Sequence, residues 1–465
     1  MTTLPPPGYA RHSYWLETCG DDLAPRPSLD GSVDVDVAIL GAGYSGLWTA
    51  YYLLKREPPL RVAIVEAEIA GFGASGRNGA WCTSGFPTGP DVLAAKYGKA
   101  AAQRVVRAMA ATVAEVGRVA DAEGIDIQWT KGGQLIVARG PEQLAAIAHE
   151  HRTMTDLGFG GRVRLLDKRE TDARVRIAGV VGGYADSETA TIHPGRLVRG
   201  LARTVERMGA TIFERTPVTA YTGGPHPALH TARGDVRART IVLCGEAYLS
   251  RLKPLRRQVM PVYSLITLTE PLSAADWAEI GWEGRECVAS CRYQVDYLSK
   301  TADGRILFGG RGAPYHFGSS IKDGYDRHSA THSMLMDNVR AWFPRLKDVR
   351  FSHTWGGPLG WPRDFMPTMA YDPVRNVATA RGYTGNGVAT ANLAGRILTD
   401  LITGRPSDLA DLPCVNHRSP NWEPEPFRFL GVRYVQRAYA AIDAKAEKTG
   451  IAPDGTSLAE RLTKH

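Results

Sequence analysis

The sequence has 465 residues, a length that predicts two or three compact units rather than one small core. Hydrophobic residues make up 43% and charged residues 22% of the chain, as in ordinary globular proteins, and no continuous apolar stretch of about 18 residues predicts a membrane span. The formal net charge of +8 is not gathered into a basic arm, so we expect no nucleic-acid partner.

Six cysteines are few for this length, and no apolar leader follows the opening MTTLPPPGYA, so we expect reduced thiols and a cytoplasmic protein. Cys287 and Cys291 have a spacing that one helix could present to a metal ion. No second Cys/His pair lies near them in sequence, and we therefore predict no metal site.

Residues 1–30 are polar and interrupted by proline, and they include an aromatic pair, Tyr14 and Trp15. We interpret them as an arm packed over the body of the protein. The segments that follow predict one βαβ unit: an apolar run at residues 33–40, a helical stretch at 47–56 and a second apolar run at 61–65.

Helical stretches at residues 95–123 and 141–157 flank a strand-like segment at 128–138, and together they predict an insertion. A second β/α passage then begins at His193, with a helix, one strand TIFERTPVTAY at 211–221 and another strand at 240–245.

Residues 256–350 are rich in strand-forming and aromatic residues, which predicts a second domain. The Gly-rich loop GYTGNGV and the helical stretch after it indicate a return to the first domain. The tail from Trp422 to Lys448 predicts a helix packed on the body, with contact to a membrane surface as the alternative.

Gly41, Gly43 and Gly46 form the pattern G-x-G-x-x-G between the first predicted strand and its helix, and Glu66 ends the next strand. Such glycines permit a tight turn, close approach of a pyrophosphate and close packing of helix on strand, while the acidic residue binds ribose hydroxyls. This context predicts a dinucleotide site. The similar GFGASG at residues 71–76 lacks that context, and we do not interpret it as a second site.

Further motifs resemble the D-amino-acid oxidase superfamily of flavoenzymes: GASGRNGA at 73–80, TPV at 216–218, TIVLCGEAYL at 240–249, GRILFGGRG at 304–312 and GYTGNGV at 382–388. Within it, the S-G-R-N-G loop and the aromatic arm are most similar to the gamma-glutamylputrescine oxidase branch. The resemblance implies FAD as cofactor and an α/β fold, in which a discontinuous Rossmann-like FAD domain joins a substrate domain built on an antiparallel sheet.

This fold implies a division of the chain into an arm (1–30), an FAD-binding domain (31–95, 160–255 and 352–412), a substrate domain (96–159 and 256–351) and a C-terminal helical tail (413–465). The residues that the resemblance and the fingerprint assign to FAD are Gly41, Gly43, Tyr44, Ser45, Gly46, Glu66, Ala67, Gly73, Ala74, Ser75, Arg77, Asn78, Gly79, Val218, Gly245, Gly382, Tyr383, Thr384, Gly385, Asn386, Gly387 and Val388.

Covalent attachment of the flavin is not expected. Sarcosine oxidase, in the same superfamily, uses a cysteine where this chain has Gly357, and other relatives use a histidine near the position of Arg77. The lysine that sarcosine oxidase places over the flavin for oxygen chemistry corresponds to Leu307, and its carboxylate-binding lysine corresponds to Ala389. Oxygen as the acceptor and a glycine-like substrate therefore lose support.

The resemblance implies oxidation of the carbon–nitrogen bond of a small amine to an imine, with oxygen or another acceptor reoxidising the flavin. Arg311 is the candidate for a substrate-facing anion site, because a guanidinium binds anions bidentately, and Tyr263, Tyr293 and Trp355 are candidates for an aromatic cavity wall. We expect His193, His316 and His353 to be structural. The alternatives are a flavin dehydrogenase with a non-oxygen acceptor, a flavoprotein linked to RNA modification, and a redox-inert scaffold.

Overall fold

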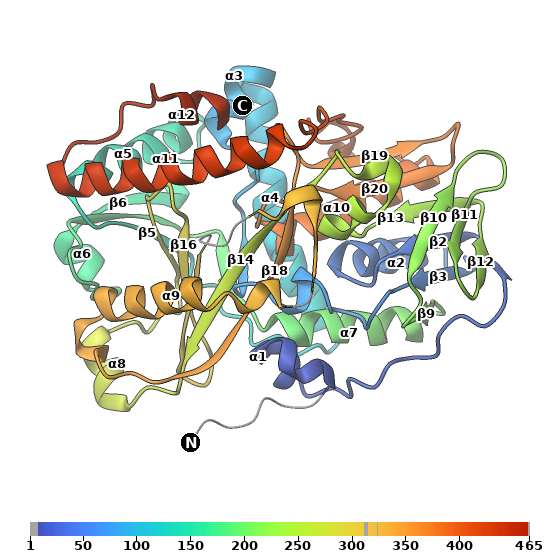
Figure 1. Cartoon of the computed structure of the whole chain (residues 1–465), viewed down its shortest axis with the longest axis horizontal. Helices are drawn as coiled ribbons and strands as arrows, with labels where there is room; N and C mark the ends of the chain where they lie inside the picture. The colour runs from blue at the N-terminus through green and yellow to red at the C-terminus, as the bar shows by residue number, and fades with distance from the viewer. Residues whose placement is uncertain (1–7, 311–314, 323, 464–465) are drawn as a thin grey trace.

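The computed structural model describes residues 8–310, 315–322 and 324–463 and contains two large sheets, which lie in opposite halves of the molecule in Figure 1. The first has six strands in the order β19 (Thr368–Asp372), β20 (Val377–Arg381), β13 (Thr240–Leu243), β2 (Val37–Leu40), β3 (Val62–Val65) and β9 (Thr211–Phe213). All neighbours pair in parallel except β19 and β20. This is the predicted α/β dinucleotide-binding arrangement.

The central strands β2 and β3 are apolar at every position because both faces of this sheet are covered. Val37, Ile39 and Ile64 face a core shared with helices α2 (Tyr44–Arg56), α7 (Pro194–Arg207) and α10 (Gly387–Thr403). The alternate residues, Ala38 and Ala63, face a smaller core against a four-stranded sheet, ordered β1 (Val33–Asp34), β12 (Gly234–Arg237), β11 (Ala228–Thr231) and β10 (Val218–Thr222). The first half is therefore built in three layers.

The second large sheet has eight strands in the order β18 (Phe351–Trp361), β14 (Met260–Thr269), β17 (Ile306–Gly310), β16 (Asp296–Lys300), β15 (Cys287–Ser290), β5 (Gln134–Ala138), β7 (Gly182–Asp186) and β6 (Val163–Asp167). Its pairs are antiparallel except for β15 and β5. The predicted antiparallel sheet is thus confirmed, with one parallel junction where two distant segments of the chain meet.

The remaining helices surround these sheets. They are α1 (Tyr14–Glu17), α3 (Pro90–Tyr97), α4 (Lys99–Ala122), α5 (Pro141–Asp156), α6 (Lys168–Asp172), α8 (Ala274–Ile280), α9 (Ser329–Trp342), α11 (Phe427–Thr449) and α12 (Leu458–Thr463). A two-stranded ribbon joins β4 (Trp81–Thr83) to β8 (Thr189–Thr191). The tail forms the expected helix, α11, which crosses the front of the molecule in Figure 1. Among the described residues, no helix is long and apolar enough to cross a membrane.

Two predictions about strands differ from the structure. The single strand expected at residues 211–221 is two strands in different sheets, β9 and β10, because Arg215 adopts a left-handed backbone (φ 50°) and Pro217 cannot donate to a ladder. The predicted division placed residues 160–255 with the FAD domain, whereas β6 and β7 in that range pair beside β5 in the eight-stranded sheet.

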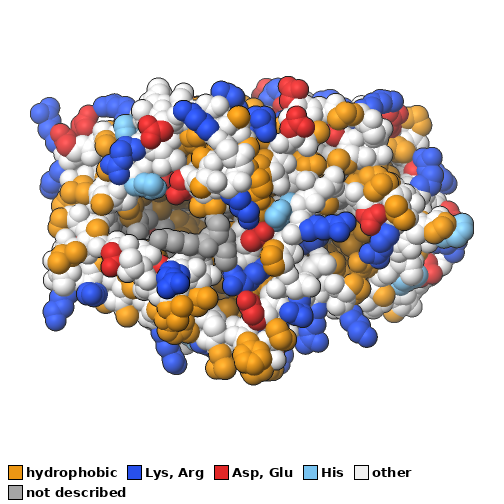
Figure 2. All heavy atoms as spheres, turned by 90° about the horizontal axis from the view of Figure 1, so that it is seen from above, with side chains coloured by type: hydrophobic (Ala, Val, Ile, Leu, Met, Phe, Trp, Pro, Cys, Tyr) orange, Lys and Arg blue, Asp and Glu red, His pale blue; other side chains and the backbone are white. Residues whose placement is uncertain are grey.

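The cysteine pair considered as a metal site is not on a helix, since Cys287 lies in β15. Within the described ranges, no group of three His, Cys, Asp or Glu side chains could hold a metal ion. On the face shown in Figure 2, Lys and Arg side chains are interspersed with acidic and apolar ones.

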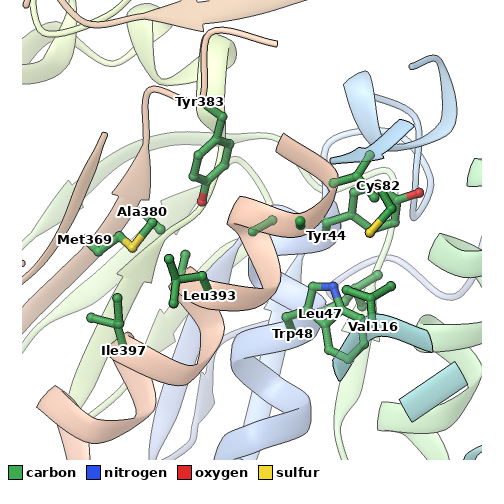
Figure 3. Packing of buried hydrophobic residues seen from close by; sticks show 14 of the residues in the cluster. Tyr44, Leu47, Trp48, Cys82, Val116, Met369, Ala380, Tyr383, Leu393 and Ile397 are labelled. Atoms are coloured by element: carbon green, nitrogen blue, oxygen red, sulfur yellow. The ribbon is translucent and has the colours of Figure 1, made fainter. Parts of the chain in front are cut away.

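Helices α2 and α10 pack closely in the core shown in Figure 3, where Leu47 and Trp48 of α2 lie beside Val116, and Leu393 of α10 lies beside Ile397 and Met369. The close contact between the two helices depends on Gly395, because a Cβ atom added there would lie 2.8 Å from the backbone carbonyl carbon of Trp48. Backbone cannot move away as a flexible side chain can, so this crossing has no room for a methyl group.

We expect Gly395→Ala to lower the thermal unfolding midpoint of the apoprotein by about 2–5 °C, as overpacking of about 1–3 kcal/mol predicts. The matched control is Gly431→Ala in α11, where an added Cβ meets nothing within 4 Å. That variant should unfold at or slightly above the parent temperature, because alanine favours helix over glycine. A Gly395→Ala protein as stable as the control would contradict this packing.

Candidate functional site

A cavity of about 730 Å³ opens at the carboxyl ends of β2, β3 and β13. The residues that were assigned to FAD from sequence and that line it are Gly41, Gly43, Tyr44, Ser45, Glu66, Ala67, Gly73, Ala74, Ser75, Arg77, Asn78, Val218, Gly245, Tyr383, Gly385, Gly387 and Val388. Those that do not line it are Gly46, Gly79, Gly382, Thr384 and Asn386. Segments far apart in sequence therefore meet at one cavity, at the sheet edge where dinucleotides bind.

Gly41 and Gly43 lie in the turn before α2, and Gly46 lies in the first turn of that helix. Gly41 has φ 99°, and a Cβ there would lie 2.8 Å from the carbonyl oxygen of Cys244. A Cβ on Gly46 would lie 2.0 Å from the carbonyl oxygen of Gly41, so Gly46 packs the turn without lining the cavity. Gly43 caps the helix without a side chain, and the first amide of α2, that of Tyr44, donates to Ser75 Oγ at 2.9 Å. The helix N-terminus faces the cavity, and such a terminus favours an anion.

Glu66 lies at the end of β3, and two backbone amides orient its carboxylate. Oε2 accepts from the amide of Ala42 at 2.8 Å, and Oε1 accepts from the amide of Glu68 at 3.1 Å. Desolvation nevertheless raises the pKa of this carboxyl to about 7. The carboxylate lines the cavity beside the glycine turn, where it can accept hydrogen bonds from ribose hydroxyls.

The loop at residues 76–79, called the GRNG loop below, has all four of its carbonyl groups bound by side chains. Ser13 Oγ donates to the carbonyl of Gly76 (2.6 Å), Trp355 Nε1 to Arg77 (2.9 Å), Trp15 Nε1 to Asn78 (2.8 Å) and Ser299 Oγ to Gly79 (2.6 Å). Trp355, predicted as a cavity wall, does not line the cavity and instead supports this loop.

Arg77 lies nearly buried in the cavity wall, with its guanidinium 4.2 Å from the ring centroid of Phe72. Its Nη1 lies 3.4 Å from both Asp326 Oδ2 and the carbonyl oxygen of Gly356. In the described part of the chain, its buried Nε and Nη2 have no hydrogen-bond partner. Buried donors of this kind normally bind something, and a guanidinium is suited to an anionic oxygen.

Glu246 was not predicted, yet it organises the Gly-rich loop at 382–388. Its buried carboxylate accepts from the amides of Gly360 (2.5 Å), Gly382 (2.9 Å) and Tyr383 (3.0 Å), and desolvation raises its pKa. The amides of residues 382 and 383 are therefore engaged by the protein itself. Gly385 and Gly387 still line the cavity.

The other candidates are dispersed. Tyr263 lines the cavity, whereas Tyr293 lies beside the C-terminal helices, where its hydroxyl donates to Glu460 at 2.5 Å. Arg311 lies outside the described residues. His193 caps α7 and His353 contacts Glu17, consistent with structural roles.

Sequence reasoning missed further cavity residues, among them Arg11, His12, Tyr248, Lys322, Asp326 and Arg327. Arg11 and His12 belong to the arm that was expected to pack over the body, and the aromatic pair after them was the available signal. Tyr248 lies in the motif TIVLCGEAYL, but the motif did not mark it as a cavity residue. Lys322, Asp326 and Arg327 have no local motif, because only the folding of distant loops brings them to the cavity.

The family model for FAD dependent oxidoreductases matches residues 36–401, most of the chain. The chain belongs to this family. FAD is accordingly its cofactor, and the fit is visible in the helix N-terminus that faces the cavity, the oriented Glu66 and the unpaired donors of Arg77.

The chain is 31% identical to the gamma-glutamylputrescine oxidoreductase of Escherichia coli (strain K12), and the match covers 91% of this chain and 97% of that protein. It is 23% identical to the sarcosine oxidase subunit beta of Rhodobacter capsulatus, over 81% and 86% of the two chains. Among solved structures, glycine oxidase from Geobacillus kaustophilus superposes with a TM-score of 0.69, covering 83% of this chain and 99% of that one at 21% identity. The last likeness confirms the fold.

We expect FAD to bind more tightly as pH rises from 6 to 8, because the Glu66 carboxyl, with its pKa of about 7, accepts ribose hydrogen bonds best when ionised. Glu66→Gln should remove this pH dependence and weaken binding at pH 8 by about tenfold, as loss of one charge-assisted bond predicts. The measurement is fluorescence titration of the apoprotein with FAD. The control is Glu270→Gln, an exposed glutamate paired with Arg350; equal pH dependence in both variants would exclude Glu66 as the ribose ligand.

Proposed function

We propose that this flavoenzyme oxidises the carbon–nitrogen bond of a small primary or secondary amine to an imine, which water then hydrolyses. The observation that carries the proposal is the match over nearly the full length of both chains to a protein named gamma-glutamylputrescine oxidoreductase. A relative named sarcosine oxidase subunit beta also supports a carbon–nitrogen bond as the bond that is oxidised.

Bound FAD supplies the hydride acceptor in such a reaction. The chain's own residues position and shield it: the α2 N-terminus and Arg77 offer donors to anionic oxygens, and the Glu66 carboxylate holds the ribose. Tyr263 provides an aromatic surface in the cavity, and its ring lies 5.9 Å from that of Tyr325, edge to face. Such a surface excludes water and packs against an uncharged amine, the form that gives up a hydride.

The proposed substrate does not carry a carboxylate on the carbon that is oxidised. Ala389 is fully buried within α10 and packs in the apolar core, so this position offers no cation to a carboxylate. Arg311 remains our proposed anion-binding residue farther along the substrate, which suits an acylated or otherwise extended amine.

We propose oxygen or another oxidant as the electron acceptor. One observation favours the alternative, a flavin dehydrogenase that uses an acceptor other than oxygen. Leu307, at the position where sarcosine oxidase has a lysine for oxygen chemistry, is fully buried in an apolar cluster with Trp15 and Trp355. No cation is therefore offered at this position to stabilise reduced oxygen species. Rapid mixing of the reduced enzyme with oxygen distinguishes an oxidase from a dehydrogenase by the rate of flavin reoxidation.

We expect the purified protein to be yellow and to release intact FAD into the supernatant on acid precipitation. Cys244 is the cysteine that lines the cavity among the described residues, and burial raises the pKa of its thiol to about 12. A covalent thioether requires the reactive thiolate, which is scarce at such a pKa. Flavin absorbance that stays with the denatured pellet would contradict non-covalent binding.

The substrate class is tested by anaerobic mixing with two panels, one of N-methyl, D- and glycine-type α-amino acids, the other of polyamines, their acyl derivatives and ω-amino acids. We expect the second panel to bleach flavin absorbance near 450 nm at least tenfold faster, since an unsatisfied carboxylate beside the reacting carbon costs about 1.4 kcal/mol or more. Faster bleaching by the first panel would overturn the substrate assignment, and bleaching by neither would overturn the proposed reaction.

A further inference from the structure

The N-terminal arm (1–30) contains a short 3-10 turn, η1 (Gly8–His12), followed by Ser13 and helix α1 (Tyr14–Glu17). It precedes the segment 36–401 that defines the family. The arm is nevertheless packed into the body beside α7 (Figure 1), and Trp15 and Leu16 are no more than 2% exposed. An arm that merely covered the surface would not be buried to this degree.

Two of the four side chains that hold the GRNG loop come from this arm. Ser13 Oγ donates to the carbonyl of Gly76, and Trp15 Nε1 donates to the carbonyl of Asn78. Arg77 and Asn78 of this loop line the cavity. The arm therefore fixes a loop that forms part of the cavity wall.

The arm also contributes residues to the cavity itself. Arg11 and His12 both line it, and the imidazole of His12 packs edge to face on Phe72, with ring centroids 5.1 Å apart. Burial and the nearby charge of Arg77 lower the pKa of His12 to about 4, so its ring is neutral near pH 7. Arg11 thus adds a cation and His12 a neutral wall to a site that takes an anionic dinucleotide.

Arg327 ties the arm to the second half of the molecule. Its Nη2 donates to the carbonyl of Arg11 at 2.7 Å, and its Nη1 donates to the carbonyl of Thr354, in β18, at 2.6 Å. Arg327 itself also lines the cavity. One guanidinium therefore links the arm, the eight-stranded sheet and the mouth of the cavity.

We propose that the N-terminal arm is a working part of the FAD site: Ser13 and Trp15 hold the GRNG loop in its binding form, Arg11 and His12 contact the bound dinucleotide, and Arg327 keeps the arm closed over it. FAD can leave only when the arm detaches. The inference concerns retention of the cofactor, and it holds or fails independently of which substrate the enzyme oxidises.

The test compares FAD dissociation from the holoenzyme for three variants and three matched controls. Ser13→Ala is paired with Ser273→Ala, because both serines cap a helix but only Ser13 reaches the loop. Trp15→Phe is paired with Trp422→Phe, because both indoles donate to one backbone carbonyl. Arg327→Ala is paired with Arg176→Ala, because both guanidinium groups bind two carbonyls.

The holoenzyme is diluted into excess adenosine diphosphate ribose, which occupies the emptied site and prevents FAD from binding again. Release of FAD is followed by the rise in flavin fluorescence. We expect each arm variant to release FAD about tenfold faster than its control, as the loss of one buried hydrogen bond predicts. Arg11→Ala should have a smaller effect, about threefold, because that side chain is exposed at the mouth. Release at the same rate from all arm variants and their controls would overturn the proposal.

A second measurement on the unaltered protein covers the case in which a variant does not fold. Hydrogen exchange of the amides of Leu16, Glu17 and Thr18, which bond to Ser13 and Tyr14 within the arm, is compared in the apoprotein and the FAD complex. We expect FAD to slow exchange there at least tenfold, because bound FAD opposes opening of the arm. Identical exchange in both states would also overturn the proposal.

Discussion

The site depends on the hydrogen bonds that hold the four carbonyl groups of the GRNG loop. Gly76 and Arg77 are buried and Asn78 and Gly79 are half-buried, and an unpaired buried carbonyl costs about 1–3 kcal/mol. The donors come from three separate parts of the chain: Ser13 and Trp15 from the arm, Trp355 from β18 and Ser299 from β16. The loop is therefore the place where the arm and the eight-stranded sheet are joined to the dinucleotide-binding half.

Two carboxylates at the cavity are held in place by hydrogen bonds from backbone amides. Amides bind the carboxylates of Glu66 and Glu246, and desolvation raises the pKa of both. Arg77 differs, since two of its buried nitrogen atoms have no partner in the described part of the chain. Carboxylates that the backbone holds in place, and donors held in a buried wall, are preorganised groups of the kind that reduce the ordering cost of binding.

The sequence was sufficient for features that depend on neighbours in the chain. The glycine turn, Glu66 and the helix after them could be predicted because φ angles, close approach and strand-helix alternation are local properties. The Gly-rich loop at 382–388 was found by resemblance, but the capture of its first amides by Glu246 was not, because that contact joins residues more than a hundred positions apart.

The predictions that depended on long-range packing were less successful. The sequence does not show towards which side an aromatic side chain points, so Trp355 and Tyr293 were expected in the cavity wall. In the structure, Trp355 supports the GRNG loop and Tyr293 contacts Glu460. The split between β9 and β10 falls at residues 214–217, where polar residues and Pro217 interrupt the apolar pattern and the backbone turns at Arg215, so Pro217 was the available signal. Asp326 and Arg327 lie in no recognisable motif, and only the tertiary fold brings them to Arg77 and Arg11.

The central claim is that one cavity, with the GRNG loop as its wall and the arm as its cover, binds FAD. A crystal structure of the FAD complex tests it most directly. The account predicts the diphosphate at the N-terminus of α2, a flavin or phosphate oxygen within hydrogen-bonding distance of Nε or Nη2 of Arg77, and Arg11 and His12 in contact with the dinucleotide. FAD bound with the arm displaced from residues 76–79, or with those Arg77 atoms still unpaired, would contradict it.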